Sequence, residues 1–326
     1  MSACESDLSE SSHPLSHSSL IRPVSPEIPN EPIQPIPTSW ALDSRKVALG
    51  EKLFSDPRLS HSNTVACASC HNLEAGGTDQ AFRSIGIGGA LGDINTPTVY
   101  NSGLNVRQFW DGRAHTLEDQ IEGPIQHSKE MGSTWQEIIH KLKTDPMYVE
   151  IFEALYHDGI SRDTIKHAIA TFERSLLTPN SRFDRYLQGN HSVLTEQEKQ
   201  GYALFKEYGC SACHQGANVG GNMFQKFGVT GDYYKEQRYG QKDKNSKEPS
   251  ITHDSHRHQN RLYKVPSLRM AVLTPPYFHD GSASTLEQAV RVMAQYQLGR
   301  SLNQEQIDAI VAFLYTLPGT YKGKQL

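Results

Sequence analysis

The sequence predicts a mainly α-helical protein built from two similar domains in tandem, with long loops. Three observations favour this fold class: apolar residues recur with helical spacing, strand-like alternation is short and rare, and motifs in the first half return in the second. With 326 residues, of which 37% are hydrophobic, the chain is long enough for two domains of ordinary size. We expect these domains to cover residues 39–180 and 181–326.

The first 38 residues are expected to form a disordered tether. They are rich in Ser, Pro, Glu and Asn, and such a composition buries too little apolar surface to offset the entropy of ordering. Cys4, in Ser2-Ala3-Cys4, has two interpretations of about equal weight. It is a chance cysteine, or it ends a lipoprotein cleavage box whose signal peptide has been replaced by Met1.

Caps and apolar stripes predict the best-defined helices. A single apolar stripe predicts a helix over residues 162–176. A capping box of Thr195 and Glu198 predicts a second helix from Thr195 to Tyr208, before Gly209. Asn303 caps a third helix that ends before Pro318-Gly319, and a fourth is expected over residues 285–296.

The two halves repeat one another at matching offsets. Gly50-Glu51-Lys52-Leu53-Phe54 in the first half corresponds to Gly201-Tyr202-Ala203-Leu204-Phe205 in the second. Pro97 leads after 13 residues to Trp110, and Pro266 leads after 13 residues to His279. Both positions are followed by Asp-Gly. Equal spacing over this length indicates an internal duplication.

Four of the five cysteines form two copies of the motif C-x-x-C-H. In this motif the two thiols bond to the vinyl groups of a haem, and the histidine binds its iron. Two copies therefore predict two covalently bound c-type haems, one in each of two tandem cytochrome c-like domains. The copies are Cys67-Ala68-Ser69-Cys70-His71 and Cys210-Ser211-Ala212-Cys213-His214.

Other metal sites are less consistent with the sequence. The paired cysteines of a zinc site usually lie about 15–20 residues apart, whereas Cys70 and Cys210 are separated by 140 positions. A thioredoxin-like pair needs a βαβ context that is missing here. The histidines of the charged stretch from Tyr239 to Asn260 are expected to be incidental residues of a solvated loop. They are His253, His256 and His258.

Charge and hydropathy argue against a nucleic-acid-binding protein and against a membrane-spanning one. The net charge is -4 and charges of both signs are scattered, so no basic stripe is present to follow a nucleic acid backbone. No apolar run approaches the roughly 20 residues that span a bilayer.

The two halves differ where their haem chemistry would have to differ. In the second half Met293 is a potential second iron ligand, and a Met–His pair raises the reduction potential of a haem. The first half has Gln120 and Glu130 instead. A carboxylate beside an open haem can move the proton of bound hydrogen peroxide to the leaving oxygen, and an amide can orient that oxygen. Taken alone, Met293 would be a core residue and Glu130 a solvated surface acid.

From about Asp43 to the C-terminus the chain resembles the bacterial di-haem cytochrome c peroxidases, within a wider group that includes the MauG-like enzymes. The resemblance implies a peroxidatic haem on His71 and a high-potential haem on His214 with Met293. It also implies that Glu130 and Gln120 are distal catalytic residues and that Trp110 relays electrons between the haems. The matching segments include Cys70-His71-Asn72-Leu73, Gln108-Phe109-Trp110-Asp111-Gly112-Arg113, Thr178-Pro179-Asn180-Ser181-Arg182-Phe183-Asp184, Val265-Pro266-Ser267-Leu268-Arg269 and Pro276-Tyr277-Phe278-His279-Asp280-Gly281.

The same resemblance implies further properties. A calcium ion is expected at Asn95 with the backbone carbonyls of Thr274 and Pro276, since oxygen ligands suit calcium. A periplasmic homodimer is expected, which takes electrons from a small cytochrome c or a cupredoxin and uses hydrogen peroxide as its substrate. Two alternatives stay open: a MauG-like enzyme that oxidises tryptophans of a partner protein, and a non-catalytic di-haem electron carrier. MauG has Tyr where Met293 stands, so the methionine favours the peroxidase.

One position departs from the family. Many members have a histidine sixteen residues after the first haem-binding histidine, where it blocks the peroxidatic iron until the other haem is reduced. Here that residue is Ile87, in a glycine-rich segment. Because isoleucine has no lone pair for iron, we expect an open site in the oxidised protein, unless His115 or His127 takes the blocking role.

Overall fold

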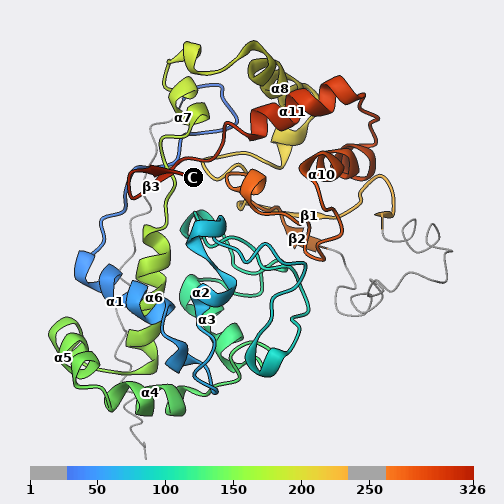
Figure 1. Ribbon diagram of the computed structural model, residues 1–326. Coiled ribbons are helices and arrows are strands. Elements are labelled where there is room, and N and C mark those ends of the chain that lie inside the picture. Colours follow the sequence, from blue (N-terminus) through green and yellow to red (C-terminus); the bar gives the residue numbers. More distant parts are fainter. Residues whose placement is uncertain (1–27, 234–261) are drawn as a thin grey trace, which may run out of the picture.

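A computed structural model describes residues 28–233 and 262–326, so Cys4 and the three histidines of the charged stretch lie outside the described residues. The described chain forms two helical lobes joined by long loops (Figure 1). The mainly helical fold predicted from the sequence is confirmed.

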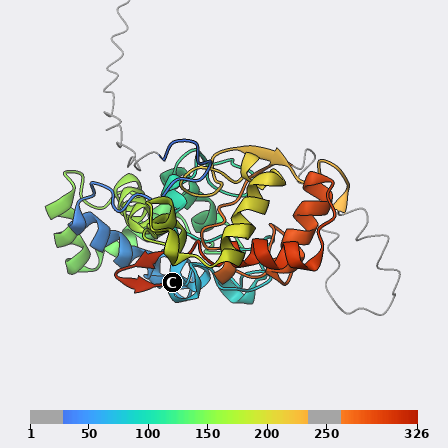
Figure 2. The same ribbon diagram turned by 90° about the horizontal axis from the view of Figure 1, so that it is seen from above.

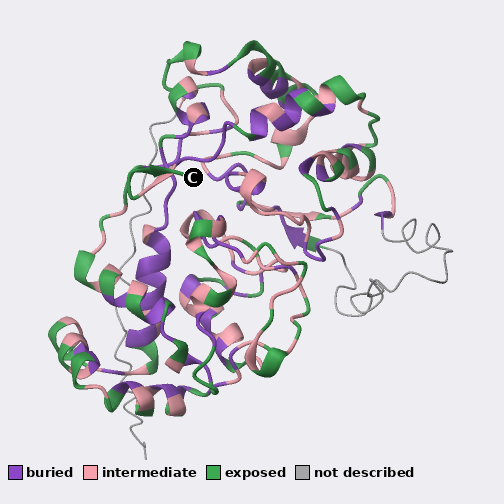
Figure 3. Ribbon diagram, in the orientation of Figure 1, coloured by how far each residue is buried: buried purple, intermediate pink, exposed green. Residues whose placement is uncertain are grey.

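The first lobe contains the helices α1 to α6. Helix α6 is the most buried of them and runs through the middle of the lobe (Figure 3). The short helix α2 coincides with the first pair of cysteines. The bounds are α1 Ser44–Phe54, α2 Cys67–Cys70, α3 Leu117–Gln126, α4 Trp135–Lys143, α5 Pro146–Leu155 and α6 Arg162–Ser175.

The second lobe contains the remaining helices and one small antiparallel sheet, in which β1 pairs with β2. A second two-stranded pair, β3 with β4, ends the chain. The bounds are α7 Arg182–Leu187, α8 Glu196–Glu207, α10 Leu286–Val292, the π-helical turn η9 Met293–Gln297, α11 Gln304–Leu314, β1 Phe224–Lys226, β2 Leu262–Lys264, β3 Thr320–Tyr321 and β4 Lys324–Gln325.

The predicted caps are present. The side chain of Thr195 accepts from the backbone N–H of Glu198 at the start of α8, and Asn303 accepts from that of Gln306 at the start of α11. Gly209 follows α8 with a φ of 88°, a conformation that glycine adopts without strain. Local sequence therefore sets where these helices begin and end.

The duplication is visible in how the helices pack. Helix α1 packs against α6 in the first lobe, and α8 packs against α11 in the second (Figures 1 and 2). A Cβ on Gly50 would lie 2.0 Å from the carbonyl oxygen of Ala168, and one on Gly201 would lie 1.8 Å from that of Ala309. Each helix pair thus needs glycine at its closest approach, which explains the repeated glycine in the sequence.

Residues 28–38 differ from the expected tether because they pack against the second lobe. Ile33 is fully buried in the second hydrophobic core and pairs with Gly216, while Ile36 is 3% exposed. The two isoleucines give this proline-rich segment enough apolar surface to dock. At the other end of the chain, Tyr321 returns to the first lobe, where its ring lies 5.3 Å from that of Tyr100.

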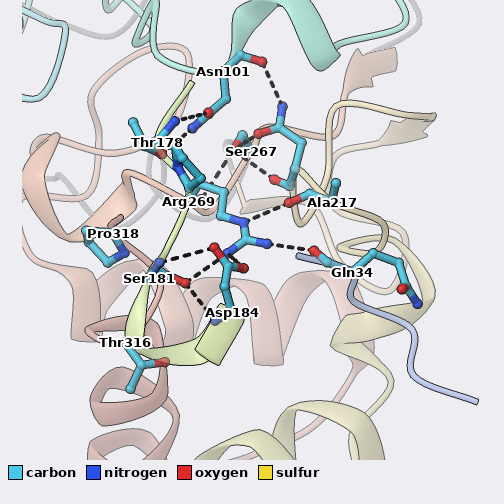
Figure 4. Close-up of polar contacts among 12 residues, drawn as sticks. Gln34, Asn101, Thr178, Ser181, Asp184, Ala217, Ser267, Arg269, Thr316 and Pro318 are labelled. Atoms are coloured by element: carbon cyan, nitrogen blue, oxygen red, sulfur yellow. Dashed lines mark hydrogen bonds and ion pairs between the residues drawn. The ribbon is translucent and has the colours of Figure 1, made fainter. Parts of the chain in front are cut away.

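A buried ion pair connects the N-terminal segment with two parts of the second lobe (Figure 4). Arg269 is fully buried and donates to Asp184 Oδ1 at 2.8 Å. It also donates to the backbone carbonyls of Ala217 and Gln34, each at 2.7 Å. Arg269 therefore connects α7, the loop after the second C-x-x-C-H motif and the N-terminal segment.

Among residues 28–233 and 262–326, none of the helices combines the length and the apolar character needed to cross a membrane.

Candidate haem sites and the residues around them

The first C-x-x-C-H motif forms one short helical turn followed by its histidine. His71 caps α2 and donates through Nδ1 to the carbonyl of Gly77 at 3.3 Å. Burial lowers the pKa of His71, so the ring is neutral at ordinary pH. A neutral imidazole whose Nδ1 donates to a carbonyl leaves Nε2 available for iron.

The second motif repeats this arrangement on the 3-10 turn Cys210–Ala212. His214 donates through Nδ1 to the carbonyl of Val219 at 3.3 Å, and burial lowers its pKa to about 4. A phenylalanine lies beside each histidine at the same ring distance, 6.4 Å: Phe54 beside His71 and Phe205 beside His214. The two histidine sites are therefore equivalent in geometry.

A cavity adjoins the second motif and suits a haem. Its lining includes Cys210, Cys213, His214 and Met293, together with the apolar side chains of α10 and α11. Met293 is the first residue of the π-helical turn η9, an irregularity that is frequent at functional sites. Two thiols, a neutral imidazole and a thioether lining one apolar cavity are the donors that a covalently bound haem requires.

Glu130 lies near the first motif. Burial raises its pKa, while electrostatic interactions with His127 and Arg113 act in the opposite direction. Its Oε1 lies 3.4 Å from Nδ1 of His127. Burial raises the pKa of Cys70, and the carboxylates of Asp79 and Glu130 add to this effect, so an ionisable group stands near the site where the first haem would attach.

Gln120 lies on α3 and is half-buried. Its side chain makes no hydrogen bond within the part of the chain that the structure describes. One turn later, a Cβ on Gly123 would come within 2.8 Å of the Phe109 ring, so this face of α3 packs closely. Within the described structure, the carboxamide of Gln120 thus has no competing hydrogen-bond partner.

Ile87 begins a 3-10 turn in the glycine-rich segment, which is docked on the backbone around Glu130. The N–H of Ile87 donates to the carbonyl of Glu130 at 2.9 Å. A Cβ on Gly86 would lie 1.9 Å from the carbonyl oxygen of Lys129, and one on Gly132 would lie 2.4 Å from Cδ1 of Ile87. The Ile87 side chain therefore ends against Gly132. The alternative blocking residue His115 is exposed, whereas His127 faces Glu130.

Trp110 lies where the two lobes meet. Its Nε1 donates to the backbone carbonyl of Asn95 at 3.0 Å, and its ring stands edge-on to that of His279, with centroids 6.2 Å apart. Trp110 also lines the cavity of the second motif. The duplicated positions Trp110 and His279 are thus in direct contact.

The three residues expected at a calcium site lie around the same cavity. Asn95, Thr274 and Pro276 all contribute to its lining, and Nδ2 of Asn95 donates to the carbonyl of Ala81 at 3.0 Å. In the described residues, Oδ1 of Asn95 and the carbonyls of Thr274 and Pro276 accept no hydrogen bond. The described residues contain no group of three or more His, Cys, Asp or Glu side chains that would hold a metal.

Two buried ionisable residues were not predicted from the sequence. Glu173, on α6, is 6% exposed, and burial raises its pKa to about 8. Burial is the main cause of the raised pKa of Cys67, and the carboxylate of Glu173 adds to it, so Glu173 lies near the first haem motif. Lys264, at the end of β2, is 9% exposed, and burial lowers its pKa to about 8. Neither residue belongs to a sequence motif that would mark it as buried, so both were found only in the fold.

Two c-type haem motifs with equivalent neutral histidines, in a duplicated helical fold, define a di-haem c-type cytochrome. The family described as di-haem cytochrome c peroxidase matches residues 44–192. The cytochrome c551 peroxidase of Nitrosomonas europaea is 46% identical over 89% of this chain and 85% of its own length. The chain therefore belongs to the bacterial di-haem cytochrome c peroxidase family.

Two further relatives agree with this assignment. The cytochrome c peroxidase Ccp of Escherichia coli is 48% identical over 91% of this chain, and the chain spans 63% of the length of that relative. A MauG-like protein associated with microbial copper homeostasis has a similar structure, with a TM-score of 0.73 and 27% identity over 90% of this chain and 94% of its own. The expected family is confirmed, and two c-type haems fit it.

Proposed function

We propose that this chain reduces hydrogen peroxide to water, with electrons that enter at the second haem and are used at the first. The observation that supports this proposal is that two equivalent histidine sites have different surroundings. Met293 lines the cavity of the second, while Glu130 lies near the first. The similarity to cytochrome c551 peroxidases supports this reaction and a small cytochrome as donor.

In the proposed reaction each peroxide takes up two electrons and two protons and yields two waters. When bound, the first haem supplies the iron at which the oxygen–oxygen bond breaks. Glu130 accepts the proton of the near peroxide oxygen and delivers it to the leaving oxygen, a role that suits a carboxyl whose pKa is raised by burial. Gln120 orients the leaving oxygen through its unengaged carboxamide.

Trp110 is proposed to connect the two haem sites. It lines the second cavity, and its indole N–H is fixed by the carbonyl of Asn95. Its ring also contacts His279, the corresponding residue of the second repeat. An aromatic ring held in this place suits an electron relay, in addition to its packing role.

The test of the acid–base role is Glu130→Gln, which keeps the shape and removes the carboxylate. We expect both haems to bind and peroxide turnover to fall by about 10²-fold or more, the usual scale for a lost general acid–base group. Glu153→Gln, the same change at an exposed position on α5, is the matched control. Gln120→Ala is expected to cost less than Glu130→Gln. Full activity of Glu130→Gln would show that another group moves the proton.

A calcium ion at Asn95, Thr274 and Pro276 is part of this proposal. Their free oxygens lie around one cavity and are of the type that calcium prefers. A chelator is expected to lower turnover and added calcium to restore it. Calorimetry that finds no calcium binding would remove this part of the proposal.

The proposed location is the periplasm, because bacteria assemble covalent c-type haem outside the cytoplasm. The proposed active form is a homodimer, and a cupredoxin is the alternative donor to a small cytochrome. A lipid anchor at Cys4 remains a hypothesis that mass spectrometry of the native protein decides. Sedimentation at several protein concentrations tests the dimer.

The MauG-like alternative is the main competitor, since the relatives include a MauG of Methylorubrum extorquens that is 34% identical over 78% of this chain. Met293 lines the second cavity and argues for the peroxidase. Peroxide-dependent oxidation of a reduced cytochrome separates the two, because a tryptophan-oxidising enzyme would not turn over that donor efficiently. The same assay excludes a non-catalytic carrier.

A further inference from the structure

Lys264 is a buried cation that has no counter-charge among the described residues. It is 9% exposed at the end of β2 and lines the cavity of the second haem motif. Its ammonium group makes no ion pair or hydrogen bond within residues 28–233 and 262–326. Burial is the cause of its lowered pKa, with no contribution from a neighbouring charge.

The described lining of the cavity offers no acid to pair with Lys264. No Asp or Glu is among the described residues that line the cavity, whereas two exposed cations, Lys226 and Arg300, also line it. Burying an ammonium group without a partner is costly, and buried charges in proteins are normally paired. Because the described lining supplies no negative charge, a molecule that fills the cavity would be its natural source.

The backbone of Lys264 is fixed by the duplication. Its N–H donates to the carbonyl of Trp110 at 2.8 Å. In the other repeat, the N–H of Asn95 donates to the carbonyl of His279, also at 2.8 Å. Lys264 is thus the counterpart of Asn95, the residue proposed above to hold calcium. Corresponding positions of the two repeats would then each bring a positive charge to the boundary between the haem sites.

We propose that the ammonium group of Lys264 pairs with a propionate carboxylate of the second haem and holds the reduction potential of that haem high. The inference rests on the second haem binding at His214, as proposed above. A nearby positive charge favours the state with the extra electron, because reduction lowers the charge at the iron. In a low-dielectric cavity this effect is larger than at the surface.

The test is a spectroelectrochemical titration of both haems in the loaded protein, that is, the protein with both haems attached, for the wild type and three variants. Lys264→Met removes the charge and keeps much of the side-chain volume. Lys264→Arg retains the charge. Lys226→Met removes an exposed charge that lines the same cavity and is the matched control. Haem content, measured on denatured protein, shows whether each variant carries both haems.

We expect Lys264→Met to lower the midpoint potential of the second haem by an amount that makes its reduction equilibrium about tenfold less favourable, about 59 mV for one electron. Lys264→Arg should restore most of this shift, Lys226→Met should produce a much smaller one, and the first haem should change least. An unchanged second midpoint in Lys264→Met, or an equal shift in Lys226→Met, would overturn the proposal. A protein that binds only one haem would instead contradict the proposed function.

Discussion

Removing the buried arginine of the second lobe should destabilise the protein strongly. In Arg269→Met, Asp184 would keep a carboxylate that is 1% exposed and has lost its cation, and two backbone carbonyls would lose their donors. Breaking a buried pair by removing one partner costs about 3–5 kcal/mol. Because the lost bonds share one side chain, their separate costs do not add, and we expect a total of about 3–5 kcal/mol.

Guanidinium unfolding of the loaded protein, followed by circular dichroism and by haem absorbance, measures this loss. The control is Arg45→Met, which breaks an exposed ion pair with Asp43 and should leave the unfolding midpoint unchanged. Asp184→Leu combined with Arg269→Met should recover part of the loss, since the double variant leaves no unpaired carboxylate. A loss below about 1 kcal/mol in Arg269→Met, the scale of a surface pair, would refute this account of the pair.

Three further predictions concern the haem sites. Trp110→Ala should slow electron transfer from the second haem to the first without loss of either; unchanged transfer in stopped flow would reduce Trp110 to a packing residue. The oxidised protein should give a high-spin ferric signal beside a low-spin one in electron paramagnetic resonance, because Ile87 offers iron no ligand; two low-spin signals would contradict the open site. The stability of Glu173→Gln minus that of the wild type should be greater at about pH 9 than at about pH 5. The folded pKa of Glu173, about 8, is raised above its ordinary value of 4.5, so its contribution to stability is lost as pH rises through this range. Parallel pH–stability curves for the two proteins would refute the raised pKa.

The duplication was predictable because its signals are local and repeated. Gly50 and Gly201 stand at the same offset before their motifs, and the structure shows both at the closest approach of a helix pair. Capping residues such as Thr195 and Asn303 likewise act on the backbone next to them, so the helix starts followed from sequence.

What the sequence did not reveal depends on contacts between distant segments. Ile33 lies in a proline-rich stretch, and its burial depends on the loop at Gly216, far along the chain. Lys264 follows a tyrosine in a short strand, and nothing beside it in sequence indicates that it faces a cavity whose described lining contains no acid. The placement of Glu130 near Cys70 likewise needed the fold, although the resemblance had pointed to its role.

The central claim is tested most directly by adding hydrogen peroxide to the loaded protein with an excess of reduced small c-type cytochrome. The account predicts catalytic oxidation of the donor, with two donor molecules oxidised for each peroxide consumed. Donor oxidation that stops after the two haems have turned over once, or peroxide loss without donor oxidation, would contradict it.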